Sequence, residues 1–137
     1  LFQNLSSIKK GIIDAGIKVA LDLDGNISPS WVPEQRGIFV IDKKNQYEQK
    51  LISESNWEQL TTYWQQFTEN KNRNIRSKAE FNMALSSELD GRIDDAITWA
   101  TKSFQTSFRN QTDLYIKKLK SRKAELEEIE RNRKKAQ

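Results

Sequence analysis

A single glycine, Gly91, separates two stretches of helix-forming sequence that carry small residues at helical spacing. Ala84 before it and Ala96 after it would let two antiparallel helices approach closely. Glycine suits the turn between them because a side chain would crowd the chain reversal there. The other residues expected to pack this unit are Met83, Ile93 and Ile97. The spacing therefore predicts a helical hairpin over residues 75–107.

A bulkier apolar stripe lies upstream of this hairpin. Trp57, Leu60, Trp64 and Phe67 follow one another at steps of three, four and three, the spacing of one face of an amphipathic helix. We interpret this stripe as a core face, the alternative being an aromatic platform on which a ligand stacks. The pattern predicts a degenerate helical hairpin over residues 45–69 that stacks on the first.

The remaining segments complete a helical domain. In residues 1–23 apolar side chains recur at steps of three and four, and we expect an amphipathic helix there. Residues 24–44 concentrate glycine, proline and serine, and we expect a loop that continues as an extended connector packed on helices. A long C-terminal helix should cover residues 111–135. The expected fold is one all-α domain over residues 1–137, a short superhelix of about five to six helices.

Composition restricts the possible functions. The 137 residues include no Cys and no His, which removes thiolate and imidazole chemistry and the commonest metal ligands. Asp94 and Asp95 are neighbours at a helix start, where carboxylates favour the positive end of the helix dipole, and do not form an opposed catalytic pair. No apolar run approaches the length that spans a bilayer. We expect no enzyme, no cofactor, no metal and no transmembrane segment.

The formal net charge of +4 comes entirely from the C-terminal half. From Leu114 onward, lysines and arginines are interleaved with glutamates, a pattern typical of a solvated helix with intrahelical ion pairs. We therefore expect no nucleic-acid partner. The alternative is a basic helical protein that binds nucleic acid or acidic surfaces through this tail.

The hairpin over residues 75–107 resembles a tetratricopeptide repeat. The matching residues are Asn82, Met83, Ala84, Gly91, Ile93, Asp94, Ala96 and Ile97. Polar or small residues replace the usual ones at Glu80, Ser87, Ala100 and Ser103. The resemblance implies stacked hairpins whose concave groove binds another protein. Polar residues on the first helix are candidate groove contacts, namely Lys78, Glu80, Asn82 and Ser87.

A Trp between two prolines forms a second motif, with Trp31 and Pro33 followed by Arg36. The prolines fix an extended path, so Trp31 can hold the segment on the helices while Arg36 pairs with a carboxylate or caps a helix. The alternative is a rigid edge that presents Trp31 and Arg36 to a partner, since both residue types are favoured at binding hot spots.

Nearly the whole chain also resembles a family of uncharacterised envelope lipoproteins of Bacteroidota-type bacteria. The matching motifs, in order, are Ala15-Gly16, Pro29 to Pro33 with Arg36, Asn56-Trp57 with Trp64, Ala79 with Asn82 to Ala84, and Ala96 to Ala100. The resemblance implies a periplasmic or outer-membrane-associated scaffold, a subunit or accessory lipoprotein of a larger assembly. A lipid-bearing Cys would lie outside this chain.

Overall fold

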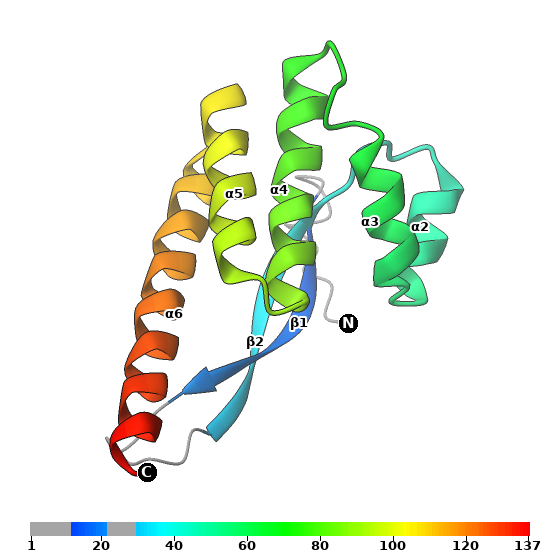
Figure 1. The fold of residues 1–137 in the computed structure, drawn as a ribbon. Helices are drawn as coiled ribbons and strands as arrows, with labels where there is room; N and C mark the ends of the chain where they lie inside the picture. Colours follow the sequence, from blue (N-terminus) through cyan, green and yellow to red (C-terminus); the bar gives the residue numbers. More distant parts are fainter. Residues whose placement is uncertain (1–11, 22–29) are drawn as a thin grey trace.

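The structure, a computed structural model, describes residues 12–21 and 30–137, with side chains described from Arg36 onward. This part contains two strands, β1 (Ile12–Leu21) and β2 (Ser30–Phe39), followed by five helices (Figure 1). The helices are α2 (Gln46–Ser53), α3 (Trp57–Gln65), α4 (Arg73–Leu89), α5 (Ile93–Thr106) and α6 (Asn110–Lys135). The prediction of a mainly helical fold with a long C-terminal helix is confirmed.

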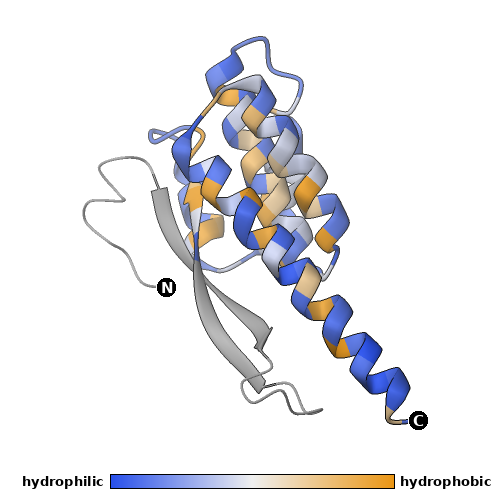
Figure 2. Cartoon of the chain, turned by 90° about the vertical axis from the view of Figure 1, so that its left-hand side faces the viewer, coloured by the Kyte–Doolittle hydropathy of each residue, from blue (hydrophilic) through white to orange (hydrophobic). Residues whose placement is uncertain are grey.

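Each helix packs chiefly against its neighbours in sequence. The main contacts run from α2 to α3, from α3 to α4, from α4 to α5 and from α5 to α6, and Figure 1 shows the helices side by side in this order. The hydropathy view shows the C-terminal part of α6 extending beyond the helical body (Figure 2). No helix in the described part of the chain has the length and apolarity to cross a membrane.

Asparagine side chains begin three of the helices. Asn45, Asn56 and Asn72 accept backbone N–H bonds at the first turns of α2, α3 and α4, which satisfies donors that a helix start leaves unpaired. Gly91 has a φ of +78° between α4 and α5, a conformation that glycine adopts without strain. These local signals explain why the helix limits were readable from the sequence.

Two clusters of buried side chains form the core. One joins Ile38 and Val40 to α2, α3 and α4 around Trp64 and Leu60, with Trp57 and Phe67 packed at its border. The other joins Phe39 to α4, α5 and α6 around Ala84 and Ala96, with Ile93 and Ile97 at its border. Met83 belongs to the first cluster. The aromatic stripe of α3 thus faces the core.

Residues 12–21 form a strand and not part of the helix predicted for residues 1–23. β1 pairs with β2 in an antiparallel sheet whose register runs from Ile12 opposite Phe39 to Leu21 opposite Ser30. The predicted loop and connector over residues 24–44 is likewise corrected, because Ser30–Phe39 forms the second strand. Residues 1–11 and 22–29, which hold the rest of both predictions, lie outside the described residues.

The physical reason for this correction is a second periodicity in the same residues. Residues 12–21 also alternate, with apolar side chains at 13, 15, 17, 19 and 21, and are rich in β-branched types. Gly16 in the middle disfavours a helix, whereas a partner strand satisfies the backbone. The helical interpretation leaves out that partner, because the glycines and prolines of residues 24–37 predict a loop.

Candidate interaction groove between β2 and α6

Two polar attachments fix β2 on α4. The Arg36 side chain donates to both carboxylate oxygens of Glu88, at 3.2 and 3.0 Å, and Phe39 is bound by Asn82. On α4 the step from Asn82 to Glu88 is six residues, a rise of about 9 Å. On β2 the step from Arg36 to Phe39 is three residues, about 10 Å. The spacings agree, so strand and helix run in opposite directions without strain.

Arg36 and Glu88 form the centre of a buried polar cluster. Each side chain is about 5% exposed, and the Tyr115 hydroxyl of α6 donates to Glu88 Oε2 at 2.7 Å. The Arg36 guanidinium also lies 6.0 Å from the centre of the Tyr115 ring. The cluster joins β2, α4 and α6, and a bidentate charged pair of this kind fixes their relative orientation.

Asn82 binds the backbone of β2 as a neighbouring strand would. Its Oδ1 accepts from the Phe39 N–H at 2.9 Å, and its Nδ2 donates to the Phe39 carbonyl at 2.6 Å. The backbone groups of Phe39 therefore point away from β1. Because these directions alternate along an antiparallel pair, Gly37, Gln35, Pro33 and Trp31 also direct their backbone groups outward. Pro33 agrees with this register, since it lacks an N–H to contribute to the ladder.

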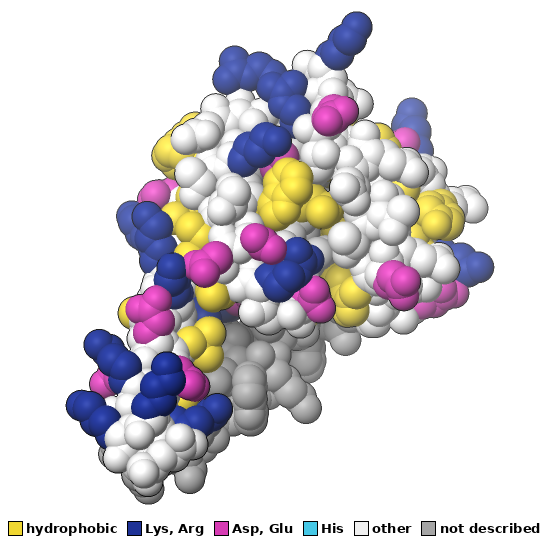
Figure 3. Space-filling model, in the orientation of Figure 1, with side chains coloured by type: hydrophobic (Ala, Val, Ile, Leu, Met, Phe, Trp, Pro, Cys, Tyr) yellow, Lys and Arg dark blue, Asp and Glu magenta, His cyan; other side chains and the backbone are white. Residues whose placement is uncertain are grey.

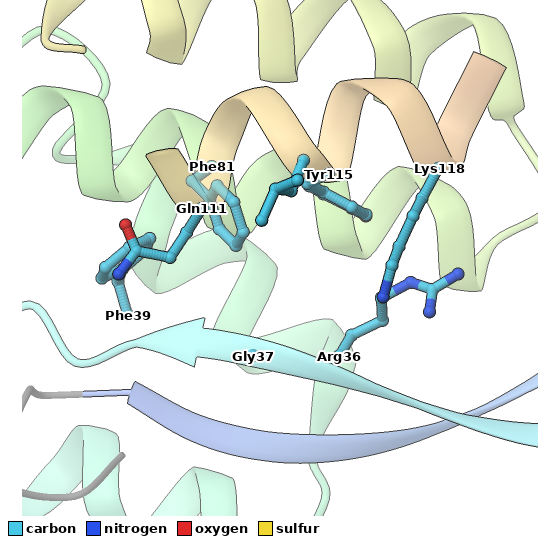
Figure 4. Close-up of a pocket in the computed structure, with 8 residues that line it drawn as sticks. Arg36, Gly37, Phe39, Phe81, Gln111, Tyr115 and Lys118 are labelled. Carbon is cyan, nitrogen blue, oxygen red and sulfur yellow. The ribbon is translucent and has the colours of Figure 1, made fainter. Parts of the chain in front are cut away.

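A groove of about 200 Å³ lies between this outward edge and α6. Figure 4 shows α6 on one side of β2 and β1 on the other. The lining residues are Arg36, Gly37, Phe39, Phe81, Gln111, Leu114, Tyr115 and Lys118. Phe81 contacts both Phe39 and Tyr115, with ring centroids 4.8 and 5.0 Å apart, so the floor is aromatic. Leu114 lines the groove and is 50% exposed.

The groove carries positive charge. Among the residues whose side chains are described, its lining contains Arg36 and Lys118 and no carboxylate, and Figure 4 shows the Lys118 side chain reaching from α6 toward Arg36. Arg109 lies over the Phe39 ring, 5.1 Å from its centre. Within the described residues, no carboxylate lies within ion-pair distance of Lys118 or Arg109. Because Glu88 neutralises Arg36, the free positive potential comes from these two side chains.

The buried Tyr115 makes the free energy of unfolding change with pH in the alkaline range. Burial, followed by the neighbouring Glu88 carboxylate, raises the pKa of Tyr115 well above its usual value. The pKa of Tyr115 is thus higher in the folded protein than in the unfolded one. The contribution of the neutral hydroxyl to the free energy of unfolding is therefore fully present below the pKa of the unfolded protein, about 10, and is lost as the pH rises above it. Tyr115→Phe should therefore lower the free energy of unfolding by about 1–2 kcal/mol at pH 8. Urea unfolding near pH 11 should show a smaller difference between the proteins, and a difference independent of pH would contradict this assignment.

Three of the residues predicted to contact a partner are buried. Glu80 and Asn82 are fully buried and Ser87 is 1% exposed, so none of them reaches a surface groove. Asn82 binds Phe39, and the Ser87 hydroxyl donates to the Met83 carbonyl at 3.0 Å. Glu80 lies 3.8 Å from Lys102 of α5. The prediction assumed that polar residues face outward, whereas here they satisfy buried backbone groups or pair across the hairpin.

The remaining residues predicted to contact a partner are Lys78, Arg36 and Trp31. Lys78 is partly buried, and burial followed by the nearby Arg109 lowers its pKa. The prediction that Arg36 pairs with a carboxylate is confirmed by its bond to Glu88, and it also lines the groove. The side chain of Trp31 lies outside the described side chains, although its backbone belongs to β2.

Sequence reasoning missed most of the groove, including Phe39, Phe81, Gln111, Leu114, Tyr115 and Lys118. One signal was present in α6, where Leu114 stands beside Tyr115 and so widens the apolar stripe beyond what packing on α5 requires.

The described residues contain no cluster of acidic side chains that could hold a metal ion.

Comparison with known proteins gives one match. A family described as Domain of unknown function (DUF6340) matches residues 47–127, which cover α3, α4, α5, most of α2 and the part of α6 that lines the groove. No curated protein and no solved structure matches the chain.

Proposed function

Because this chain belongs to the DUF6340 family, whose function is unknown, we propose its function from its geometry: it is a non-enzymatic scaffold that binds another protein. The groove between β2 and α6 carries this proposal. An aromatic floor beside an exposed Leu114 and a basic rim is the composition of a protein-binding patch, apolar at its centre and polar at its border.

The arrangement of the helices supports a scaffold of tetratricopeptide-like type. Helices that pack chiefly on their sequence neighbours form the continuous layer that stacked repeats require. At the contact between α4 and α5, Ala84, Ala96 and Ala100 are fully buried, so the two backbones approach closely. In this proposal the helical layer is the rigid support, and the binding surface lies where β2 and α6 meet.

We place the scaffold in the bacterial cell envelope, as a subunit or accessory lipoprotein of a larger assembly at the periplasmic or outer-membrane surface. The sequence resemblance to envelope lipoproteins supports this location, and a lipid anchor would lie outside the described chain. Fractionation of the producing cells, with detection of the native protein in the membrane or the soluble fraction, tests the location.

The alternative function is binding to nucleic acid or acidic surfaces through the basic tail. Its charges are interleaved along α6, as Figure 3 shows, and several are paired, as in Lys117 with Asp113 and Lys123 with Asp94. Such pairing reduces the cations available to phosphates. A salt titration with a mixed-sequence oligonucleotide separates the proposals, since phosphate binding weakens steeply with salt.

Site-specific cross-linking tests whether the groove is the binding surface. A photo-reactive benzophenone side chain in place of Leu114 should capture a discrete protein when producing cells are irradiated, because Leu114 projects from the groove rim. The same replacement at Tyr47 is the matched control, since both side chains are 50% exposed. Denaturing electrophoresis and mass spectrometry of the adducts provide the readout.

The two positions must differ for the proposal to stand. A partner captured from Leu114 and absent from Tyr47 supports the groove. Equal capture from both positions would indicate collision with abundant proteins, and an absence of adducts at Leu114 would remove the groove from consideration.

A further inference from the structure

In the part of the chain that the structure describes, no strand pairs with the outward edge of β2. Asn82 satisfies the backbone groups of Phe39, and within the described residues no other group bonds the outward edge of β2. Gly37 lies in the groove lining, and Gln35 follows it two residues away along the same edge. Gly37 and Gln35, between the occupied Phe39 and Pro33, which lacks an N–H, therefore offer a short template on which another extended chain can add.

The groove offers the side-chain contacts that such a chain needs. A strand pairing with Gly37 and Gln35 would run between β2 and α6, beside the aromatic floor. In strand addition, main-chain bonds contribute affinity, and pockets for alternate side chains contribute specificity. An entering apolar side chain would meet Phe81 and Tyr115, whose rings contact each other.

Charge defines the chemistry of the entering chain. Lys118 lines the groove and Arg109 lies over the Phe39 ring, while none of the lining residues from Arg36 onward is a carboxylate. An acidic side chain on the bound strand would pair with these cations, and a basic one would be repelled. Resting on the scaffold function proposed above, we infer that the partner contributes an extended acidic segment that adds as a strand to the outward edge of β2 beside α6.

Selection from an unbiased library tests the chemistry of the segment. The probe is a phage-displayed library of random peptides of about ten residues, the length of a long strand. The purified protein should select sequences with alternating apolar residues, Asp or Glu, and little proline. Selection of peptides with a helical period or of basic peptides would overturn the inference.

Backbone methylation of a selected peptide tests strand pairing itself. Because a paired strand directs every second N–H toward its neighbour, methylation of those nitrogens should weaken binding at least about tenfold. Methylation of the intervening nitrogens should change affinity less than about threefold, measured by fluorescence anisotropy. Equal losses at both sets of positions would overturn strand addition.

Charge reversal on α6 tests the location. Lys118→Glu should weaken the selected peptide about tenfold, whereas Lys120→Glu, the same change at an exposed residue outside the groove lining, should stay within about twofold. Circular dichroism confirms that both variants fold. Equal affinities for the two variants would place the peptide elsewhere.

The results also separate this inference from the function on which it rests. If the library yields no ligand while a benzophenone at Leu114 still captures a partner, the scaffold stands and strand addition is wrong. If the cross-linker captures nothing either, the proposed function fails with it.

Discussion

Replacing Arg36 with methionine is expected to lower the free energy of unfolding by about 3–5 kcal/mol. The change leaves the Glu88 carboxylate buried, with the Tyr115 hydroxyl as its remaining side-chain hydrogen-bond donor among the described residues. A buried charge without its counter-ion costs far more than the net contribution of the intact pair, because the desolvation penalty is no longer offset. Urea unfolding followed by circular dichroism measures the loss.

Two further variants decide whether the buried charge is the cause. Adding Glu88→Met to Arg36→Met should recover part of the lost stability, since the double variant leaves no unpaired charge. Arg92→Met is the matched control, because Arg92 pairs with Asp90 and Asp95 but is 52% exposed, and it should cost far less stability than Arg36→Met. Similar losses for Arg36→Met and Arg92→Met would contradict the role assigned to burial.

The helices were predictable because their determinants are local. The caps at Asn56 and Asn72 lie directly before the helices they begin, and Gly91 lies at the turn it permits. The apolar stripe from Trp57 to Phe67 recurs within three turns, so its inward orientation could be read from spacing alone. Such features need no information from distant parts of the chain.

The hairpin and the groove could not be predicted in the same way. Residues 12–21 fit both a helical and an alternating period, and only pairing with Ser30–Phe39 decides between them. The groove depends on contacts between distant residues, since Arg36 and Glu88 stand 52 positions apart. Its walls come from β2 and α6, the second and the last described elements. Because the strand β2 was not predicted, the groove beside it was not predicted either, although Arg36 in its lining was a candidate contact.

Polar residues on α4 gave a misleading signal for the same reason. From the sequence, Glu80 and Asn82 read as exposed groove contacts, because polar side chains usually face solvent. Asn82 is buried because β2 lies against α4 and supplies backbone groups that need partners, whereas the buried Glu80 pairs with Lys102 of α5. The role of Asn82 could not be read from the pattern of α4 alone, because its partner, Phe39, belongs to a strand elsewhere in the sequence.

Asn82→Leu should be the second strongly destabilising substitution, with an expected loss of about 2–4 kcal/mol in the free energy of unfolding. Leucine has a similar size but can neither accept from the Phe39 N–H nor donate to its carbonyl, and both bonds are buried. Two buried backbone groups would thus lose their partners at once. Urea unfolding measures the loss, with Asn132→Leu on the far end of α6 as the control, expected within about 0.5 kcal/mol of the parent.

Hydrogen exchange at the Phe39 amide distinguishes this mechanism from general loosening of α4. In the parent, Asn82 Oδ1 holds the Phe39 N–H at 2.9 Å, so exchange there requires that β2 separate from α4. In Asn82→Leu that amide should exchange much faster. The Ile38 amide faces β1 in the alternating ladder, so its exchange should change only as far as the global stability of the protein changes. Equal acceleration at both amides would mean that the whole hairpin has detached. A loss of exchange protection at Phe39 alone would establish that Asn82 occupies the end of the outward edge of β2. Asn82 would then define where an added strand must stop.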